Sequence, residues 1–149
     1  KLILNKYNIR NEIIEYDYSD LPKLTNLERC SIEFLEITDE LIDNINQLTN
    51  LKVIEFNSCD IKTSKKIKNN LEIIILQDID NQIFTLFDNP NIETLELINF
   101  KEIDLSYLSK FNHLKNLYIY NSSIINFEKI LNMGNIEVLK LKDKKVIDW

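Results

Sequence analysis

Apolar residues recur along this chain with one spacing. In the segment Leu51–Ile61 they occupy the first, fourth, sixth, ninth and eleventh places, counted from Leu51. The spacing returns in segments that begin at Leu27, Leu71, Ile92, Leu114 and Ile136, and in an earlier copy around Leu2 whose start is missing. Successive starts are 24, 20, 21, 22 and 22 residues apart. The interval between the first two copies is longer, 28 residues from Leu2 to Cys30 at the fourth place, and it predicts an insertion within Asn11–Pro22. Self-similarity at such a period predicts stacked units that share one core.

Each unit is predicted to begin with a short strand. The fourth and sixth places point inward, while the third, fifth and seventh point outward, because side chains alternate along a strand. A long return path follows each strand, so neighbouring strands are predicted to be parallel. The return after Thr38 carries an apolar stripe at helical spacing, from Leu41 to Leu48, and predicts a helix capped by Thr38 or Asp39.

The other return paths carry weaker helical signals. Asn126 is predicted to cap a helix that begins at Phe127, and Gln82–Phe87 and Ser106–Phe111 predict single helical turns. Ser64–Asn70 is almost entirely polar apart from Ile67 and makes the poorest return.

This spacing resembles that of the leucine-rich-repeat family, whose segment reads L-x-x-L-x-L-x-x-N/C-x-L. The stretch from Ile103 to Ile119 is most similar to the 22-residue class, which includes internalin-like and phosphatase-regulator-like proteins. The resemblance implies an α/β fold: a right-handed solenoid with a parallel concave sheet and short helices or 3₁₀ turns on the convex side. It implies a single domain over residues 1–149 with about seven repeats. Because the chain opens on a strand pattern at Lys1 rather than on Met, we expect a fragment of a longer protein.

One departure from the family concerns the ninth place, where asparagine normally bonds to backbone groups of the turn. Here the ninth place is not asparagine in any copy, and the residues are Tyr7, Leu35, Cys59, Ile79, Phe100, Ser122 and Lys144. Either apolar packing replaces the asparagine ladder or the turns are less regular than in the family. One glycine and two prolines also argue against many tight turns at positive φ.

Charge excludes some classes of partner. The formal net charge is −6 and the sequence pI is about 4.9, which disfavours nucleic acid and anionic membrane surfaces, since both need a basic footprint. No apolar run approaches the roughly 20 residues that cross a bilayer. We therefore expect no nucleic-acid and no membrane partner.

The sequence offers no constellation for catalysis. His113 is the single histidine and is expected in a solvated turn, and Cys30 and Cys59 occupy core places of the repeat. Asp78 and Asp80 lack the glycine-bearing loop of a calcium site, and no metal motif or cofactor motif occurs. We expect no enzyme activity, no metal and no cofactor. Two unpaired thiols favour a reducing, cytoplasmic location, while a cell-surface or secreted location stays open because the sequence need not include the N-terminus of the protein.

Outward strand places supply the candidate binding residues. Apolar residues there gather on the central strands and are expected to bind another protein: Val53, Ile73, Ile75, Ile98, Tyr118 and Tyr120. Tyrosines on a rigid sheet are typical interface anchors. Acidic residues are expected to flank this surface, namely Glu33, Glu55, Glu72, Glu93 and Glu96. The competing interpretation is that β-branched and aromatic residues simply suit strands.

Two functions follow from this interpretation. The first is a non-catalytic protein–protein interaction module. The alternative is a structural or regulatory segment of a larger protein, such as a surface adhesin, a substrate receptor or a toxin-neutralising factor.

Overall fold

The computed structural model describes residues 1–6, 17–88, 91–142 and 145–146. The predicted ninth-place residues Tyr7 and Lys144 lie outside the described residues, as does the first half of the predicted insertion, residues 11–16. In its second half Asp17 caps a 3₁₀ helix, η1 (Tyr18–Lys23).

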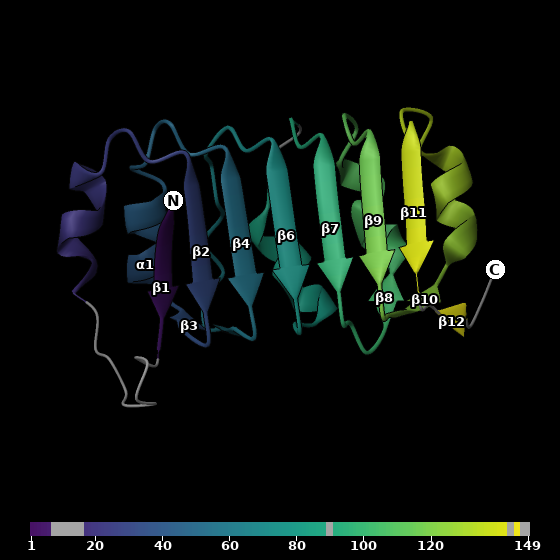
Figure 1. Cartoon of the computed structure of the whole chain (residues 1–149), viewed down its shortest axis with the longest axis horizontal. Coiled ribbons are helices and arrows are strands. Elements are labelled where there is room, and N and C mark those ends of the chain that lie inside the picture. The colour runs from purple at the N-terminus through teal and green to yellow at the C-terminus, as the bar shows by residue number, and fades with distance from the viewer. Residues whose placement is uncertain (7–16, 89–90, 143–144, 147–149) are drawn as a thin grey trace.

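Seven parallel strands form the main sheet of an α/β structure, as predicted. They are β1 (Leu2–Asn5), β2 (Arg29–Glu33), β4 (Val53–Asn57), β6 (Ile73–Gln77), β7 (Thr94–Ile98), β9 (Asn116–Tyr120) and β11 (Val138–Lys142). They lie side by side in sequence order, with the two ends of the chain at opposite ends of the row (Figure 1).

The register of the sheet is the predicted one. Each place of one unit pairs with the same place of the next, so that Ile54 lies opposite Ile74 and Leu95 opposite Leu117. Fourth-place and sixth-place side chains on β2, β4, β6, β7 and β9 are fully buried and form one continuous core. Burial of these large aliphatic and aromatic side chains is the main driving force for stacking the units.

Two smaller parallel sheets follow the main strands. One pairs β3 (Glu36–Ile37) with β5 (Asp60–Ile61), and the other contains β8 (Ile103–Asp104), β10 (Ser123–Ile125) and β12 (Lys145–Val146). The unit between them, which begins at Leu71, contributes no second strand within the described residues, because its chain enters a 3₁₀ helix at Asn81.

Because no strand of this unit pairs with β8, the side chain of Asn81 bonds to the free backbone edge of β8 instead. Its Nδ2 donates to the carbonyl oxygen of Glu102 at 3.0 Å, and its Oδ1 accepts from the backbone N–H of Asp104 at 3.3 Å. One carboxamide thus supplies both a donor and an acceptor, as a peptide group of a neighbouring strand would.

The return paths carry short helices. These are α1 (Asp39–Ile45), η2 (Asn81–Leu86), η3 (Leu105–Lys110) and η4 (Phe127–Asn132). The predicted cap of α1 is confirmed, since Thr38 accepts from the N–H of Leu41 at 3.3 Å. Asn126 is the N-cap residue of η4, as predicted, but its side chain makes no capping hydrogen bond: its backbone is left-handed, and its Nδ2 donates to Asp104 of the preceding unit at 2.8 Å.

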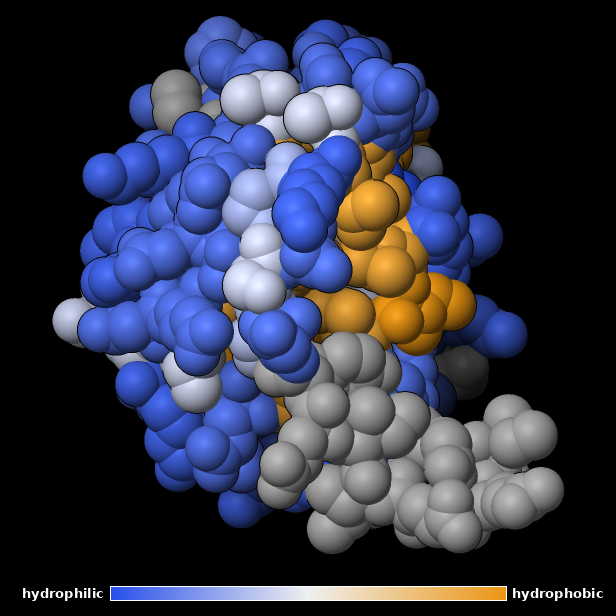
Figure 2. Space-filling view, turned by 90° about the vertical axis from the view of Figure 1, so that its left-hand side faces the viewer, coloured by the Kyte–Doolittle hydropathy of each residue, from blue (hydrophilic) through white to orange (hydrophobic). Residues whose placement is uncertain are grey.

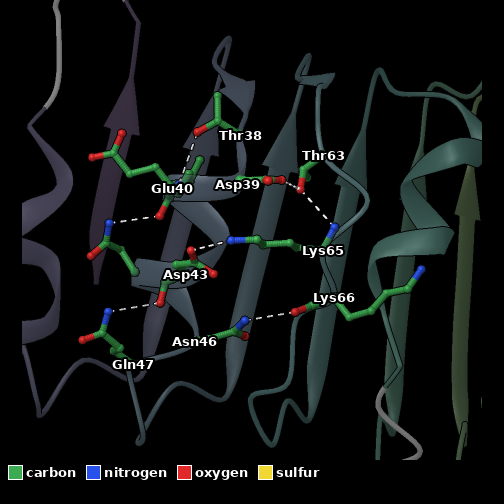
Figure 3. Close-up of polar contacts among 11 residues, drawn as sticks. Thr38, Asp39, Glu40, Asp43, Asn46, Gln47, Thr63, Lys65 and Lys66 are labelled. Atoms are coloured by element: carbon green, nitrogen blue, oxygen red, sulfur yellow. Dashed lines mark hydrogen bonds and ion pairs between the residues drawn. The ribbon is translucent and has the colours of Figure 1, made fainter.

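The helix-free return after β5 is held by polar contacts with α1 (Figure 3). Thr63 bonds to Asp39, Lys65 pairs with Asp43 at 2.6 Å, and Asn46 bonds to the backbone of the segment 66–68. Beneath these surface contacts the buried Asn69 donates to the carbonyl oxygens of Ile45, the last residue of α1, and of Leu48, just beyond its end. Side chains from two units therefore replace the hydrogen bonds that a helix would have made within this return.

The bends at the ends of the main strands use positive φ without glycine. The eighth place of successive units adopts φ between 48° and 58°, at Phe34, Ser58, Asp78, Asn99 and Asn121. The scarcity of glycine thus gave a wrong expectation. Asparagine and aspartate tolerate this conformation, and at all five positions, Phe34 and Ser58 included, the backbone N–H donates to the last carbonyl oxygen of the next main strand. Asn99 also donates to Asp78 at 3.4 Å and Asn121 to Asn99 at 3.2 Å.

The ninth places combine both possibilities that the sequence left open. Leu35 and Phe100 are buried apolar side chains, whereas Ser122 accepts from the N–H of Phe100 at 3.0 Å and donates to the carbonyl oxygen of Tyr120 at 2.8 Å. Cys59 donates through its thiol to the carbonyl oxygen of Ile32 at 3.3 Å. Polar contacts at Cys59 and Ser122 and apolar packing at Leu35 and Phe100 therefore both occur in these bends.

Candidate binding face

The six predicted binding residues lie on one face of the main sheet. We call Val53, Ile73, Ile75, Ile98, Tyr118 and Tyr120 the apolar strip. All six are partly exposed, and they come from four adjacent strands, β4, β6, β7 and β9. Their neighbours along each strand point the other way into the core, which holds these positions on a rigid support.

The register divides the apolar strip into two groups. Val53 lies opposite Ile73 on one side, and Ile98 lies opposite Tyr120 on the other. Glu96 lies between Ile75 and Tyr118 in the row of fifth places, and so it belongs inside the strip. The prediction that Glu96 flanks the strip is therefore wrong, although the spacing already assigned it to the fifth place of its unit.

A polar network borders the strip on the side of β1 and β2. Glu55 pairs with Arg29 at 3.3 Å and with Lys1 at 4.0 Å, while Glu33 accepts from Asn5 at 2.8 Å. Ser31, predicted to face solvent, is instead fully buried, because its short side chain lies beneath these longer neighbours and bonds to Glu33 at 3.2 Å.

The remaining acidic residues lie beside the strands. Glu72 and Glu93 immediately precede β6 and β7 and pair with lysines at the same place of the preceding and following unit: Lys52 at 2.9 Å and Lys115 at 3.1 Å. On β11, the ammonium of Lys140 lies 6.0 Å from the centre of the Tyr120 ring, within cation–π range. These charged side chains lie around the apolar strip and not within it.

Apolar surface is also exposed at both ends of the row. Figure 2 looks at the β1 end and shows a hydrophobic patch beside hydrophilic areas; Ile3 is 49% exposed there. At the other end Leu139 of β11 is 39% exposed, whereas Leu117 at the same place of β9 is fully buried. Leu139 is exposed because β11 is the last strand of the main sheet, and within the described residues no further strand covers it.

The groups considered for chemistry are dispersed. His113 is exposed, and burial raises the pKa of the Cys30 thiol to about 12 and raises the pKa of Cys59 as well. Thiols in this state are poor nucleophiles. Across residues 1–6, 17–88, 91–142 and 145–146 no three His, Cys, Asp or Glu side chains gather as a metal site would require.

A polar groove that the sequence did not predict lies beside the bends of three units. Its volume is about 530 Å³. The lining comes from the chain after β4, β6 and β7: Cys59, Asp60, Ile61, Lys62, Asp78, Ile79, Asp80, Gln82, Asn99 and Lys101. Asp80 caps η2 through the N–H of Gln82 at 2.8 Å, and Asp78 accepts from Gln77 at 3.0 Å. The groove lies between the two smaller sheets, at the unit that begins at Leu71 and contributes no second strand. The capping residue type at Asp80 is the sequence signal that could have located it.

Comparison with known proteins does not assign the chain to a family. No family model matches it. It is 28% identical over 123 residues to a protein translocase subunit SecA from Campylobacter jejuni, a match that covers 80% of this chain. The chain spans 14% of the length of that relative. No helix in the described part of the chain is long and apolar enough to span a membrane.

Proposed function

We propose that this chain is a leucine-rich-repeat solenoid that acts as a non-catalytic protein-binding module and binds its partner on the concave, solvent-facing side of the main sheet. The observation that carries the proposal is the apolar strip: six partly exposed apolar or tyrosine side chains on four adjacent strands. Strands of a parallel sheet are about 4.8 Å apart, so four of them offer a strip about 14 Å wide. An apolar surface of this kind on a rigid support is typical of a protein interface.

The two tyrosines are the expected anchors of this interface. Tyr118 and Tyr120 lie on β9 with their backbone held by β7 and β11 on either side. A tyrosine side chain offers a large contact area and loses little conformational entropy on binding. The inner face of β9 is filled by Leu117 and Ile119, both fully buried, so the tyrosines make no contribution to that core.

A crosslinking experiment tests this proposal. A photo-reactive amino acid is placed at Tyr118, and at the exposed Thr85 of η2 as a matched position off the sheet face. Crosslinks from position 118 with a cellular extract should contain a protein absent from the position-85 sample. The affinity of that purified protein should fall about tenfold or more in Tyr118→Ala or Tyr120→Ala, as expected for truncation of an anchor.

Thermal stability supplies the control for the same variants. If binding depends on the tyrosines as anchors, the melting temperatures of Tyr118→Ala and Tyr120→Ala should remain close to that of the wild type. Equal losses of stability and affinity would instead mean that the side chains serve the fold, and the proposal would fail.

The second candidate function is a structural or regulatory segment of a larger protein. The exposure of Leu139 and Val138 on β11 favours it, because a further strand paired with β11 would cover them. A longer gene product that contains this chain and continues the repeat spacing would support this alternative. Binding of the crosslinked partner by the isolated chain would support the first function.

A further inference from the structure

Glu96 occupies the centre of a block of face positions on β6, β7 and β9. The two strands beside β7 place Ile75 and Tyr118 directly opposite Glu96. Every other side chain in the block is neutral: Ile73, Ile75, Gln77, Thr94, Ile98, Asn116, Tyr118 and Tyr120. Glu96 is therefore the one charged position within the block.

The surroundings leave this carboxylate without a counter-ion. No ion pair joins Glu96 to a lysine or arginine anywhere in the described ranges. Asn116 donates to Thr94 at 3.1 Å, and Lys140 is directed over the ring of Tyr120. Solvent is what keeps the charge of Glu96 stable in the free protein.

Glu55, at the same place of another unit, is a carboxylate that has a counter-ion. Glu55 on β4 lies opposite Ile75 from one side, and Glu96 on β7 lies opposite the same residue from the other side. Both glutamates are partly exposed. Arg29 of β2 reaches it at 3.3 Å. The two glutamates therefore differ in whether a cation on the neighbouring strand pairs with the carboxylate.

We propose that the partner segment which covers the apolar strip carries a basic side chain between apolar ones, and that this cation pairs with Glu96 beside the ring of Tyr118. The inference rests on the proposed function of the sheet face and specifies the chemistry of the partner. A partner that covered Ile75, Ile98 and Tyr118 would remove water from Glu96, and a desolvated charge without a counter-ion opposes binding strongly.

Arginine fits this position better than lysine. A guanidinium binds a carboxylate through two parallel hydrogen bonds and also stacks on an aromatic ring, which places one group against both Glu96 and Tyr118. The formal net charge of −6 would favour the approach of a basic segment before contact.

Selection from a displayed library of random linear peptides tests the inference. Peptides are selected on the wild-type chain, and those that still bind Tyr118→Ala are removed. The retained sequences should share a basic residue with apolar residues near it. A synthetic peptide of that consensus should bind Glu96→Gln about tenfold more weakly and Glu55→Gln with affinity within about twofold of wild type.

A charge exchange checks that the contact is direct. A peptide in which glutamate replaces the basic residue should bind the wild type poorly and recover affinity on Glu96→Lys. Peptides that need Tyr118 yet bind Glu96→Gln as tightly as wild type would overturn the inference and leave the proposed function standing. If no selected peptide is weakened by Tyr118→Ala, the proposed function and the inference fall together.

Discussion

Replacement of Asn69 by alanine should destabilise the fold more than the same change at Asn46. Both asparagines join α1 to the helix-free return: Nδ2 of Asn69 donates to two backbone carbonyl oxygens, whereas the side chain of Asn46 donates to one backbone carbonyl oxygen and accepts from one backbone N–H. They differ in their surroundings: Asn69 is 7% exposed, whereas Asn46 lies at the surface among the polar contacts of Figure 3.

The magnitude follows from what remains after each change. In Asn69→Ala the carbonyl oxygens of Ile45 and Leu48 lose donors at 3.0 Å and 2.9 Å. Each carbonyl oxygen keeps one backbone donor, the N–H of Leu48 for Ile45 and the N–H of Leu51 for Leu48. The loss is therefore the net contribution of two hydrogen bonds, about 1–3 kcal/mol in total. In Asn46→Ala water replaces the side chain, and the cost should stay below about 1 kcal/mol.

Urea denaturation followed by circular dichroism measures the difference. With a slope of about 2 kcal/mol per molar urea, a loss of about 2 kcal/mol lowers the midpoint by about 1 M. Asn69→Asp should be worse still than Asn69→Ala, because it turns an acceptor toward the carbonyl oxygens of Ile45 and Leu48 and buries a charge. Equal midpoint shifts for Asn69→Ala and Asn46→Ala would refute the reasoning that burial decides the cost.

Two further predictions concern the core and acid stability. Leu117→Ala should cost about 2–5 kcal/mol, and Leu139→Ala clearly less, because Leu117 is fully buried and Leu139 is 39% exposed; comparable denaturation midpoints would contradict this. Burial tends to raise the pKa of Asp104, but hydrogen bonds from Asn126 and Ser106 outweigh it and hold the pKa below the usual 3.8. The ionised form therefore stabilises the fold above about pH 3.8, and this contribution disappears as the pH falls through the lowered pKa. Asp104→Asn should flatten the acid limb of a stability–pH curve, and an unchanged acid limb would exclude this role for Asp104.

The strands and their register could be predicted from the sequence because both depend on a short local pattern. Apolar residues at the fourth and sixth places, as at Ile54 and Phe56, determine which side of each strand is buried. The same pattern assigned Tyr118 and Tyr120 to the outer face, where the structure places them.

The features that were missed depend on contacts between units. Asn126 has the sequence of a cap, but Asp104 of the unit before it offers a better partner at 2.8 Å. Ser31 is buried by longer side chains from neighbouring strands, which no local pattern reports. The bends show a different failure, since φ of 57° at Asn99 is compatible with asparagine and needed no glycine.

Because equal places pair across the main sheet, the side chains exposed on its face and the side chains buried in its core come from different places of each unit. Two positions that are 20 to 24 residues apart in the chain, such as Glu55 and Ile75, become immediate neighbours on a surface grid. A substitution at an outward place can change the chemistry of one grid point, while the side chains beneath it stay as they are. Insertions in a return path need not alter the grid, because only the strand segment sets its spacing. Such a surface can therefore acquire a new binding preference by single steps, with little effect on folding.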